Sequence, residues 1–513
     1  MKQHLKRWIA ALLISPLFIS CHRTGETDLS LQVNTLDPGF TISNQMIGLS
    51  YETSTLLPRK GVYYFNPQNT ELLNVFRTLG IKHLRLGGNS VDEASIPQPA
   101  EADIRSFFEF AKAANLKVIY SFRLKEGDPL YAKNTARFIL DNYADQLESF
   151  AIGNEPSYYK DYALYVSKWT AIRDAILETC PQAVFSGPDQ NPDAERLKLL
   201  ADDFAQGQGP LVQLSQHNYP FGCSYVNYKE HDVSKLIPRD TLLRRNDLLS
   251  DSAYTIYREV RDGMLEAVKG KKLSFRLTET NNLWYSGLEG VSDRYVSALW
   301  GLDYLHWWSA QGIAGLNFHT GDSTGGAIAL PCRYAVFIRS DQGLEARPLA
   351  YGIKMFEQGA AGRILPLKIN SGSASQLSTY AYLNEDNELL ITLINKNNLP
   401  SASFETTNQL SDSTNKKNRL PINNREERPP VHNRTVSISF DREFSGAALL
   451  EMKAKDNYLG ALATDISLGE SGIETDGKWK GQWKKLKKPA VRKQIITLEL
   501  EPASAVVLKI SLN

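Results

Sequence analysis

Eight short apolar runs, separated by amphipathic stretches, occupy residues 46–360 of the chain. The strand-like runs cover residues 47–51, 83–86, 118–122, 149–152, 183–186, 212–216, 273–277 and 313–318. A helical pattern such as residues 102–115, with Ile104, Phe107, Phe108 and Ala111 on one face, lies between two of them. Alternating strands and helices predict a parallel sheet, and eight such units predict a closed (β/α)8 TIM barrel. A doubly wound open sheet is the alternative, although no G-x-G-x-x-G sequence opens the first unit.

After about residue 360 the hydrophobic pattern changes to period two, with turn residues between the runs. This change predicts a C-terminal antiparallel β-sandwich over residues 361–513. Residues 21–45 are expected to add a strand, near residues 29–36, to the same sandwich. The polar, proline-containing residues 405–434 are expected to form a long loop within it.

Residues 1–20 have the pattern of a secretory signal peptide. Lys2, Lys6 and Arg7 precede an apolar run over residues 8–19, which is shorter than the about 20 residues of a membrane span. The end of this segment, FISC, resembles a bacterial lipobox, whose cysteine becomes the lipidated first residue of the mature protein. We therefore expect a lipoprotein of the bacterial cell envelope, periplasmic or in the outer membrane, whose membrane attachment is a lipid on Cys21. Plain secretion is the alternative.

The composition argues against several other classes of protein. A net charge of +1 and the lack of a nucleic-acid-binding motif give no reason to expect a nucleic acid partner. Cys180, Cys223 and Cys332 have no C-x-x-C spacing, so a zinc site is not expected. The chain is expected to need neither a metal nor another cofactor.

The C-terminal ends of the predicted barrel strands carry polar residues, and barrel enzymes build their sites at this face. In chain order these residues are Glu52, Arg85, Arg123, Asn154-Glu155, His217-Asn218-Tyr219, Glu279-Thr280-Asn281 and His319. Glu155 and Glu279, after the fourth and seventh strands, face each other across the predicted mouth. Glycoside cleavage needs two such carboxylates, one to protonate the departing oxygen and one to attack the anomeric carbon or activate water.

Five motifs, IGLSYE, LRLGGNS, AIGNEP, QHNYP and LTETNNLWYSG, occur in an order that resembles glycoside hydrolase family 79 of clan A. That family comprises β-glucuronidases and heparanase-type enzymes, and the resemblance covers nearly the whole mature chain. It implies that Glu155 is the general acid/base and Glu279 the nucleophile of a retaining enzyme. It further implies that Arg85 and Tyr219 hydrogen-bond the nucleophile, and that Asn154 holds the 2-hydroxyl of the sugar.

Three further strand-end residues are weaker candidates for substrate binding. Glu52 is expected to bind a sugar hydroxyl, with a buried ion pair as the alternative. Asn89 follows two glycines, whose main chain allows a ligand to approach closely, but a turn-stabilising role suits it equally. His217 either orients a neighbouring side chain or is a buried histidine with satisfied hydrogen bonds.

A uronic acid carries a carboxylate of its own, and burying that group unpaired is costly. The resemblance implies that tyrosine hydroxyls and backbone N–H groups receive it, and Tyr285 and Tyr334 are the matching residues. Trp284 is the alternative to Tyr285 as the residue facing the pocket.

Together these features predict a retaining exo-β-glucuronidase that removes terminal glucuronic or 4-O-methylglucuronic acid from glycans. One alternative keeps the clan but changes the sugar to a β-glucoside, β-xyloside or arabinofuranoside. The other is a non-catalytic lipoprotein that binds glycans.

Overall fold

The computed structural model describes residues 28–205, 210–222, 238–322, 332–340, 342–372, 374–397, 433–487, 491–492 and 494–513. The predicted signal peptide, Cys21, Cys223 and nearly all of the predicted loop at 405–434 lie outside the described residues.

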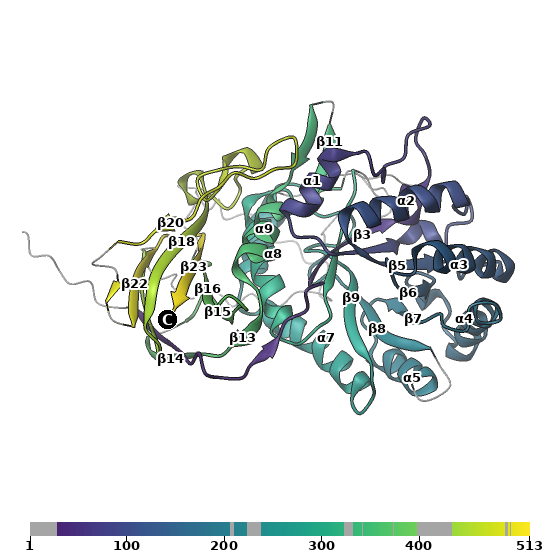
Figure 1. Cartoon of the computed structure of the whole chain (residues 1–513), viewed down its shortest axis with the longest axis horizontal. Coiled ribbons are helices and arrows are strands. Elements are labelled where there is room, and N and C mark those ends of the chain that lie inside the picture. The colour runs from purple at the N-terminus through teal and green to yellow at the C-terminus, as the bar shows by residue number, and fades with distance from the viewer. Residues whose placement is uncertain are drawn as a thin grey trace, which may run out of the picture.

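Eight parallel strands close into a barrel in chain order, with the last strand returning to the first (Figure 1). They are β3 (Ile47–Glu52), β4 (His83–Gly87), β5 (Lys117–Phe122), β6 (Leu147–Ile152), β7 (Phe185–Gln190), β8 (Leu211–Asn218), β9 (Ser274–Thr280) and β10 (Leu316–His319). The predicted (β/α)8 barrel is therefore confirmed. Because the strands are parallel and in sequence order, all their C-terminal ends meet at one mouth.

The fifth barrel strand extends further than the sequence suggests. The predicted apolar run ended at residue 186, whereas β7 continues to Gln190 and pairs with β8 up to Gln216. Pro188 has no N–H to donate, and the Asp189 N–H donates to the Ser215 hydroxyl at 3.0 Å. As a result Asp189 lies at the mouth of the barrel.

Helices cover the outside of the barrel. They are α1 (Thr70–Thr78), α2 (Glu101–Ala114), α3 (Pro129–Tyr143), α4 (Tyr162–Leu177), α5 (Ala194–Phe204), α6 (Pro238–Leu249), α7 (Ala253–Val268), α8 (Tyr295–Ser309) and α9 (Pro348–Gly359). Asn69, Asp128, Asp161 and Asp193 cap four of them by accepting a backbone N–H of the first turn. In the part of the chain that is described, no helix combines the length and apolar content needed to cross a membrane.

Two sheets form the sandwich, beside the barrel in Figure 1. One has the order β14 (Leu367–Gly372), β1 (Leu29–Val33), β17 (Arg434–Phe440), β22 (Ile495–Leu500) and β21 (Val491–Arg492). The other has the order β19 (Ile466–Leu468), β18 (Phe444–Ala454), β23 (Ser504–Leu512), β16 (Glu388–Asn395), β15 (Leu377–Leu383), β13 (Arg363–Leu365) and β2 (Phe40–Thr41), with β20 (Lys484–Lys485) beside β18. The N-terminal β1 runs antiparallel to β14 but parallel to β17, the one departure from the antiparallel pattern among the described sandwich strands. The remaining strands, β11 (Phe337–Ser340) and β12 (Gly343–Ala346), form a separate hairpin.

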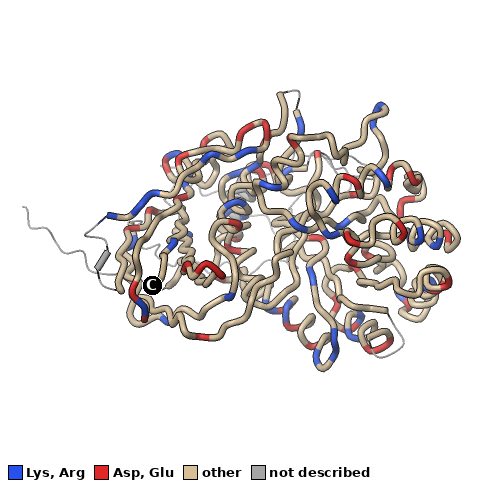
Figure 2. Tube along the Cα trace, viewed as in Figure 1, with Lys and Arg blue, Asp and Glu red and all other residues tan. Residues whose placement is uncertain are grey.

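Helices α8 and α9 lie between the barrel and the sandwich (Figure 1), and every residue of α8 except Trp307 is buried. Polar side chains also join the two parts: Asp303 of α8 accepts hydrogen bonds from Tyr254 of α7 at 2.6 Å and from Tyr380 of β15 at 2.8 Å. Lys396, after β16, places its Nζ 2.7 Å from Asp251. Elsewhere on the chain, acidic and basic residues are interspersed (Figure 2), in keeping with the small net charge.

Candidate active site

Glu155 and Glu279 lie together at the mouth of the barrel. Glu279 belongs to β9, and Glu155 follows β6 in the turn that leads to a short 3-10 helix, Pro156–Tyr158. One carboxylate oxygen of each, together with a ring nitrogen of His217, lie within 4.8 Å of one another. Retaining glycosidases place their two carboxyl groups about 5–5.5 Å apart, and inverting ones about 6.5–9.5 Å. The observed spacing therefore fits the retaining geometry.

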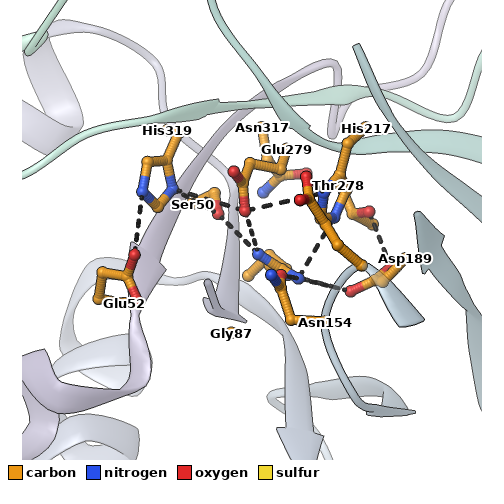
Figure 3. A network of polar contacts seen from close by, with 12 residues as sticks. Ser50, Glu52, Gly87, Asn154, Asp189, His217, Thr278, Glu279, Asn317 and His319 are labelled. Carbon is orange, nitrogen blue, oxygen red and sulfur yellow. Dashed lines mark hydrogen bonds and ion pairs between the residues drawn. The ribbon is translucent and has the colours of Figure 1, made fainter. Parts of the chain in front are cut away.

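Glu279 is surrounded by hydrogen-bond donors and positive charge (Figure 3). Arg85 Nη1 donates to its Oε2 and the Tyr219 hydroxyl to its Oε1, each at 2.8 Å, while His319 Nδ1 and His217 Nδ1 lie 3.8 and 4.0 Å from Oε2. Burial alone would raise the pKa of Glu279, but His319, Arg85 and the tyrosine hydrogen bond together lower that pKa well below its usual range. Burial and the neighbouring carboxylate raise the pKa of Tyr219, so its hydroxyl keeps the proton it donates. Glu279 is thus held as a carboxylate.

Glu155 has a more open environment. Its side chain is 29 % exposed, and its Oε1 lies 3.0 Å from His217 Nδ1. The other ring nitrogen of His217, Nε2, lies 3.3 Å from Arg85 Nη2, which is always a donor. Nε2 therefore accepts in this contact, and Nδ1 is the ring nitrogen that donates to Glu155. This hydrogen bond orients the Glu155 carboxyl group toward Glu279.

Arg85 is fully buried and shared between two carboxylates. Besides Glu279 it contacts Asp189, whose Oδ2 accepts from Nε at 3.1 Å and from Nη2 at 2.8 Å. Burial alone would raise the pKa of Asp189, but Arg85 lowers that pKa below its usual value, aided by hydrogen bonds such as the one from Thr278 at 2.8 Å. The sequence analysis missed Asp189, because the predicted fifth strand ended at residue 186 and no residue was assigned to its end. An aspartate a few residues beyond the predicted fifth strand was the available signal.

Asn154 joins this network from the acid/base side. Its Oδ1 accepts from Arg85 Nη2 at 2.8 Å, and its Nδ2 donates to Asn89 Oδ1 at 3.2 Å. Asn154 is buried, whereas Asn89 is exposed at the rim. The structure thus places Asn154 and Asn89 near Glu155 and Glu279.

Glu52 forms a buried ion pair, the interpretation that the sequence analysis had ranked below hydroxyl binding. Its Oε1 lies 3.6 Å from His319 Nε2, and its Oε2 accepts the Ser90 N–H at 2.8 Å. A Cβ on Gly88, whose φ is +68°, would lie 2.4 Å from the carboxylate, so the glycine is required there. Burial would lower the pKa of His319, but Glu279 and Glu52 raise that pKa above its usual value. His319, noted from sequence only as a strand-end residue, connects the two carboxylates.

The three predicted aromatic residues occupy two different places. Tyr334 is buried, and its ring centroid lies 6.0 Å from that of Tyr219 and 6.3 Å from that of His319. Trp284 and Tyr285 are 45 % and 40 % exposed, with ring centroids 5.6 Å apart. Tyr334 therefore belongs to the wall beside Tyr219 and His319, and the other two belong to the rim.

Within the described residues, Glu155, His217 and Glu279 are the one group with ligand atoms close enough to share a metal ion. The Arg85 guanidinium contacts both Glu279 and His217, so the protein itself supplies positive charge at this place.

No family model matches the chain, and no curated protein matches it in sequence. Among solved structures it is similar to a 4-O-α-L-rhamnosyl-β-D-glucuronidase from Fusarium oxysporum 12S, with a TM-score of 0.65 and 18% identity over 94% of this chain and 100% of that chain. It is also similar to a glycoside hydrolase family 51 arabinofuranosidase from Xanthomonas axonopodis pv. citri, with a TM-score of 0.62 and 13% identity over 94% of this chain and 100% of that chain. A family 39 enzyme from the same organism has a TM-score of 0.58 and 13% identity over 96% of this chain and 99% of that chain. The chain therefore has the fold of the clan A glycoside hydrolases.

Proposed function

We propose that this protein is a retaining glycoside hydrolase, and specifically an exo-β-glucuronidase that removes terminal glucuronic or 4-O-methylglucuronic acid from glycans. The observation that carries the proposal is the pair Glu155 and Glu279, with carboxylate oxygens within 4.8 Å of each other. Their contrasting environments support the division of labour that a retaining mechanism needs.

In the first step the Glu279 carboxylate attacks the anomeric carbon, and the bond to the glycosidic oxygen breaks. Glu155 donates its proton to that oxygen, so the leaving group departs as an alcohol. A covalent glycosyl-enzyme and a Glu155 carboxylate result. In the second step Glu155 takes a proton from a water molecule, whose oxygen attacks the anomeric carbon and releases Glu279.

The surrounding residues have roles that follow from their contacts. Arg85 and Tyr219 hold Glu279 ionised and oriented before attack. Asn154, fixed by Arg85, lies where a hydrogen bond to the sugar 2-hydroxyl would strengthen in the oxocarbenium-like transition state. His217 donates to Glu155 and so orients the carboxyl group that acts as acid in the first step and as base in the second.

The preference for a uronic acid is supported by the motif order that resembles family 79 and by the rhamnosyl-glucuronidase among the structural neighbours. Tyr334, Tyr285 and Trp284 are the residues we assign to the sugar carboxylate and the rim. We further propose, from the N-terminal sequence pattern, that the enzyme is anchored at the bacterial cell envelope through a lipid on Cys21.

A panel of 4-nitrophenyl glycosides tests the proposal. We expect nitrophenol release from the β-D-glucuronide and its 4-O-methyl derivative, and NMR should show the β-anomer of the sugar as the first product. Rapid release from the β-glucoside, β-xyloside or α-L-arabinofuranoside with none from the glucuronides would replace the substrate assignment. Glycan binding without release from any substrate would instead identify a binding protein.

A further inference from the structure

Asp92, in the loop after β4, connects three strand ends through one carboxylate. Its Oδ1 accepts the backbone N–H groups of Leu124 and Lys125, which follow β5, at 2.7 and 2.9 Å. Its Oδ2 accepts the backbone N–H of Asn154, which follows β6, at 3.0 Å and the Tyr158 hydroxyl at 3.1 Å. Both oxygens are therefore committed to protein donors on the acid/base side of the mouth.

The segment that Asp92 holds has an unusual backbone. Gly153 has φ +86°, and Glu155 itself lies in the left-handed region with φ +46° and ψ +58°. A non-glycine residue pays roughly 1–2 kcal/mol for this conformation, so the surroundings must impose it. Two contacts do so: the Asn154 N–H binds Asp92, and the Glu155 N–H binds the Asp189 carbonyl at 2.8 Å.

We propose that Asp92 is a positioning residue for the general acid/base: by anchoring the turn before Glu155, it aims the Glu155 carboxyl group at the glycosidic oxygen. This inference rests on the proposed function. Asp92 touches neither Glu155 nor the reacting atoms in this role, and it acts through the Asn154 backbone. A displacement of about 1 Å at a catalytic group can cost about 100-fold in rate, so the loss of this anchor should be visible in kinetics.

The dependence of rate on the leaving group separates this role from a general structural one. A phenol with a high pKa needs protonation as it departs, whereas 2,4-dinitrophenol leaves without it. In Asp92→Asn one carboxylate oxygen becomes an NH2 group, which cannot accept the N–H it faces; Asp92→Ala removes both acceptors. For both variants we expect kcat/KM to fall about 10- to 100-fold with unsubstituted phenyl glucuronide but to stay within about threefold of wild type with the dinitrophenyl compound.

Two other substitutions serve as comparisons for the Asp92 variants. Tyr158→Phe removes one of the four donors to Asp92, so it should give a smaller loss with the same leaving-group dependence. Asp293→Asn makes the same chemical change at a buried aspartate in the loop after β9, where Oδ1 accepts the Gly290 N–H at 2.7 Å. Because that loop does not contact the acid/base turn through this carboxylate, any loss there should be equal for all leaving groups.

Equal losses across the leaving-group series for Asp92→Asn would overturn the inference, since they would point to substrate contact or general damage. Unchanged kinetics with every substrate would overturn it as well. Thermal unfolding of each variant identifies any that fails to fold, and Tyr158→Phe still decides the question in that case. The series uses whichever sugar the wild-type protein cleaves, so a wrong sugar assignment leaves this test intact. A wild-type protein that cleaves none refutes the proposed function, and the positioning role with it.

Discussion

Glu279 and Glu155 are the same type of residue in neighbouring places, yet their surroundings differ in almost every respect. The Glu279 side chain is 10 % exposed and lies among Arg85, Tyr219 and two histidines, whereas the Glu155 side chain is 29 % exposed and accepts from one histidine. The first environment stabilises a carboxylate, and the second leaves a carboxyl group accessible to solvent protons. In the proposed mechanism this difference in environment assigns one glutamate as nucleophile and the other as acid.

The backbone at Glu279 and at Glu155 also differs. Glu279 belongs to a strand whose neighbours β8 and β10 fix its position through ladder hydrogen bonds. Glu155 lies in a turn with a left-handed conformation, anchored by Asp92 and by the Asp189 carbonyl. The position of Glu279 therefore depends on the sheet, and that of Glu155 depends on a few contacts in the loops.

The largest expected effect is the loss of the nucleophile. In Glu279→Ala no group forms the glycosyl-enzyme, and we expect kcat to fall by about 10⁴-fold or more. Azide should restore turnover of an activated aryl glycoside and give a glycosyl azide, because it occupies the space of the missing carboxylate. Unchanged hydrolysis in this variant would show that the nucleophile is a different residue.

Removal of the acid should slow substrates according to the pKa of their leaving group, whereas removal of the nucleophile should slow all substrates. In Glu155→Ala we expect kcat/KM to fall about 10²- to 10⁴-fold with leaving groups of high pKa and far less with 2,4-dinitrophenol. Measuring both substrates for both variants tests the asymmetry directly. A uniform loss in Glu155→Ala would mean that Glu155 is not the proton donor.

A smaller effect is expected when one donor to Glu279 is removed. Tyr219→Phe should cost about 10-fold in kcat/KM, the value of one hydrogen bond to a charged group. It should also move the acidic limb of the pH–rate profile to higher pH, since this hydrogen bond helps to lower the pKa of Glu279. Tyr304→Phe is the matched control: the Tyr304 hydroxyl contacts Asn218 and Thr280 but not Glu279, so the acidic limb should stay in place.

The smallest effect concerns stability. The folded-state pKa of His319 is raised, so its contribution to the free energy of unfolding is complete below the unfolded pKa of about 6.5 and is lost as pH rises through the folded value. Denaturant unfolding of wild type and His319→Gln between about pH 5 and pH 9 should therefore converge at high pH. Parallel curves for the wild type and His319→Gln would contradict the ion pair of Glu52 with His319.

His306 should show the opposite pH dependence. Burial lowers its pKa to about 3, so the contribution of His306 to the free energy of unfolding should be lost as pH falls below about 6.5.

The fold could be predicted because each barrel strand has a local signature. Buried parallel strands read as short apolar runs, and the helix between each pair shows period 3.6, so eight repeats indicate a closed barrel without any tertiary information. Glu155 and Glu279 followed from the same reasoning, since the C-terminal ends of such strands share one face. Asp189 did not, because the apolar run ends at residue 186 while the strand continues through polar residues to Gln190.

The chain sequence by itself determined which side chains reach the barrel mouth, because strand order and direction place every strand end there. Only the tertiary structure decided which of them touch: that Arg85 is shared by Glu279 and Asp189, that Glu52 pairs with His319, and that Asp92 holds the turn before Glu155. These contacts join residues from 62 positions apart, for Asp92 and Asn154, to 267 positions apart, for Glu52 and His319, and depend on barrel closure and on loop conformation. Local hydrophobic periodicity carries no information about either, because it reports which face of an element is buried and not which partner that face meets.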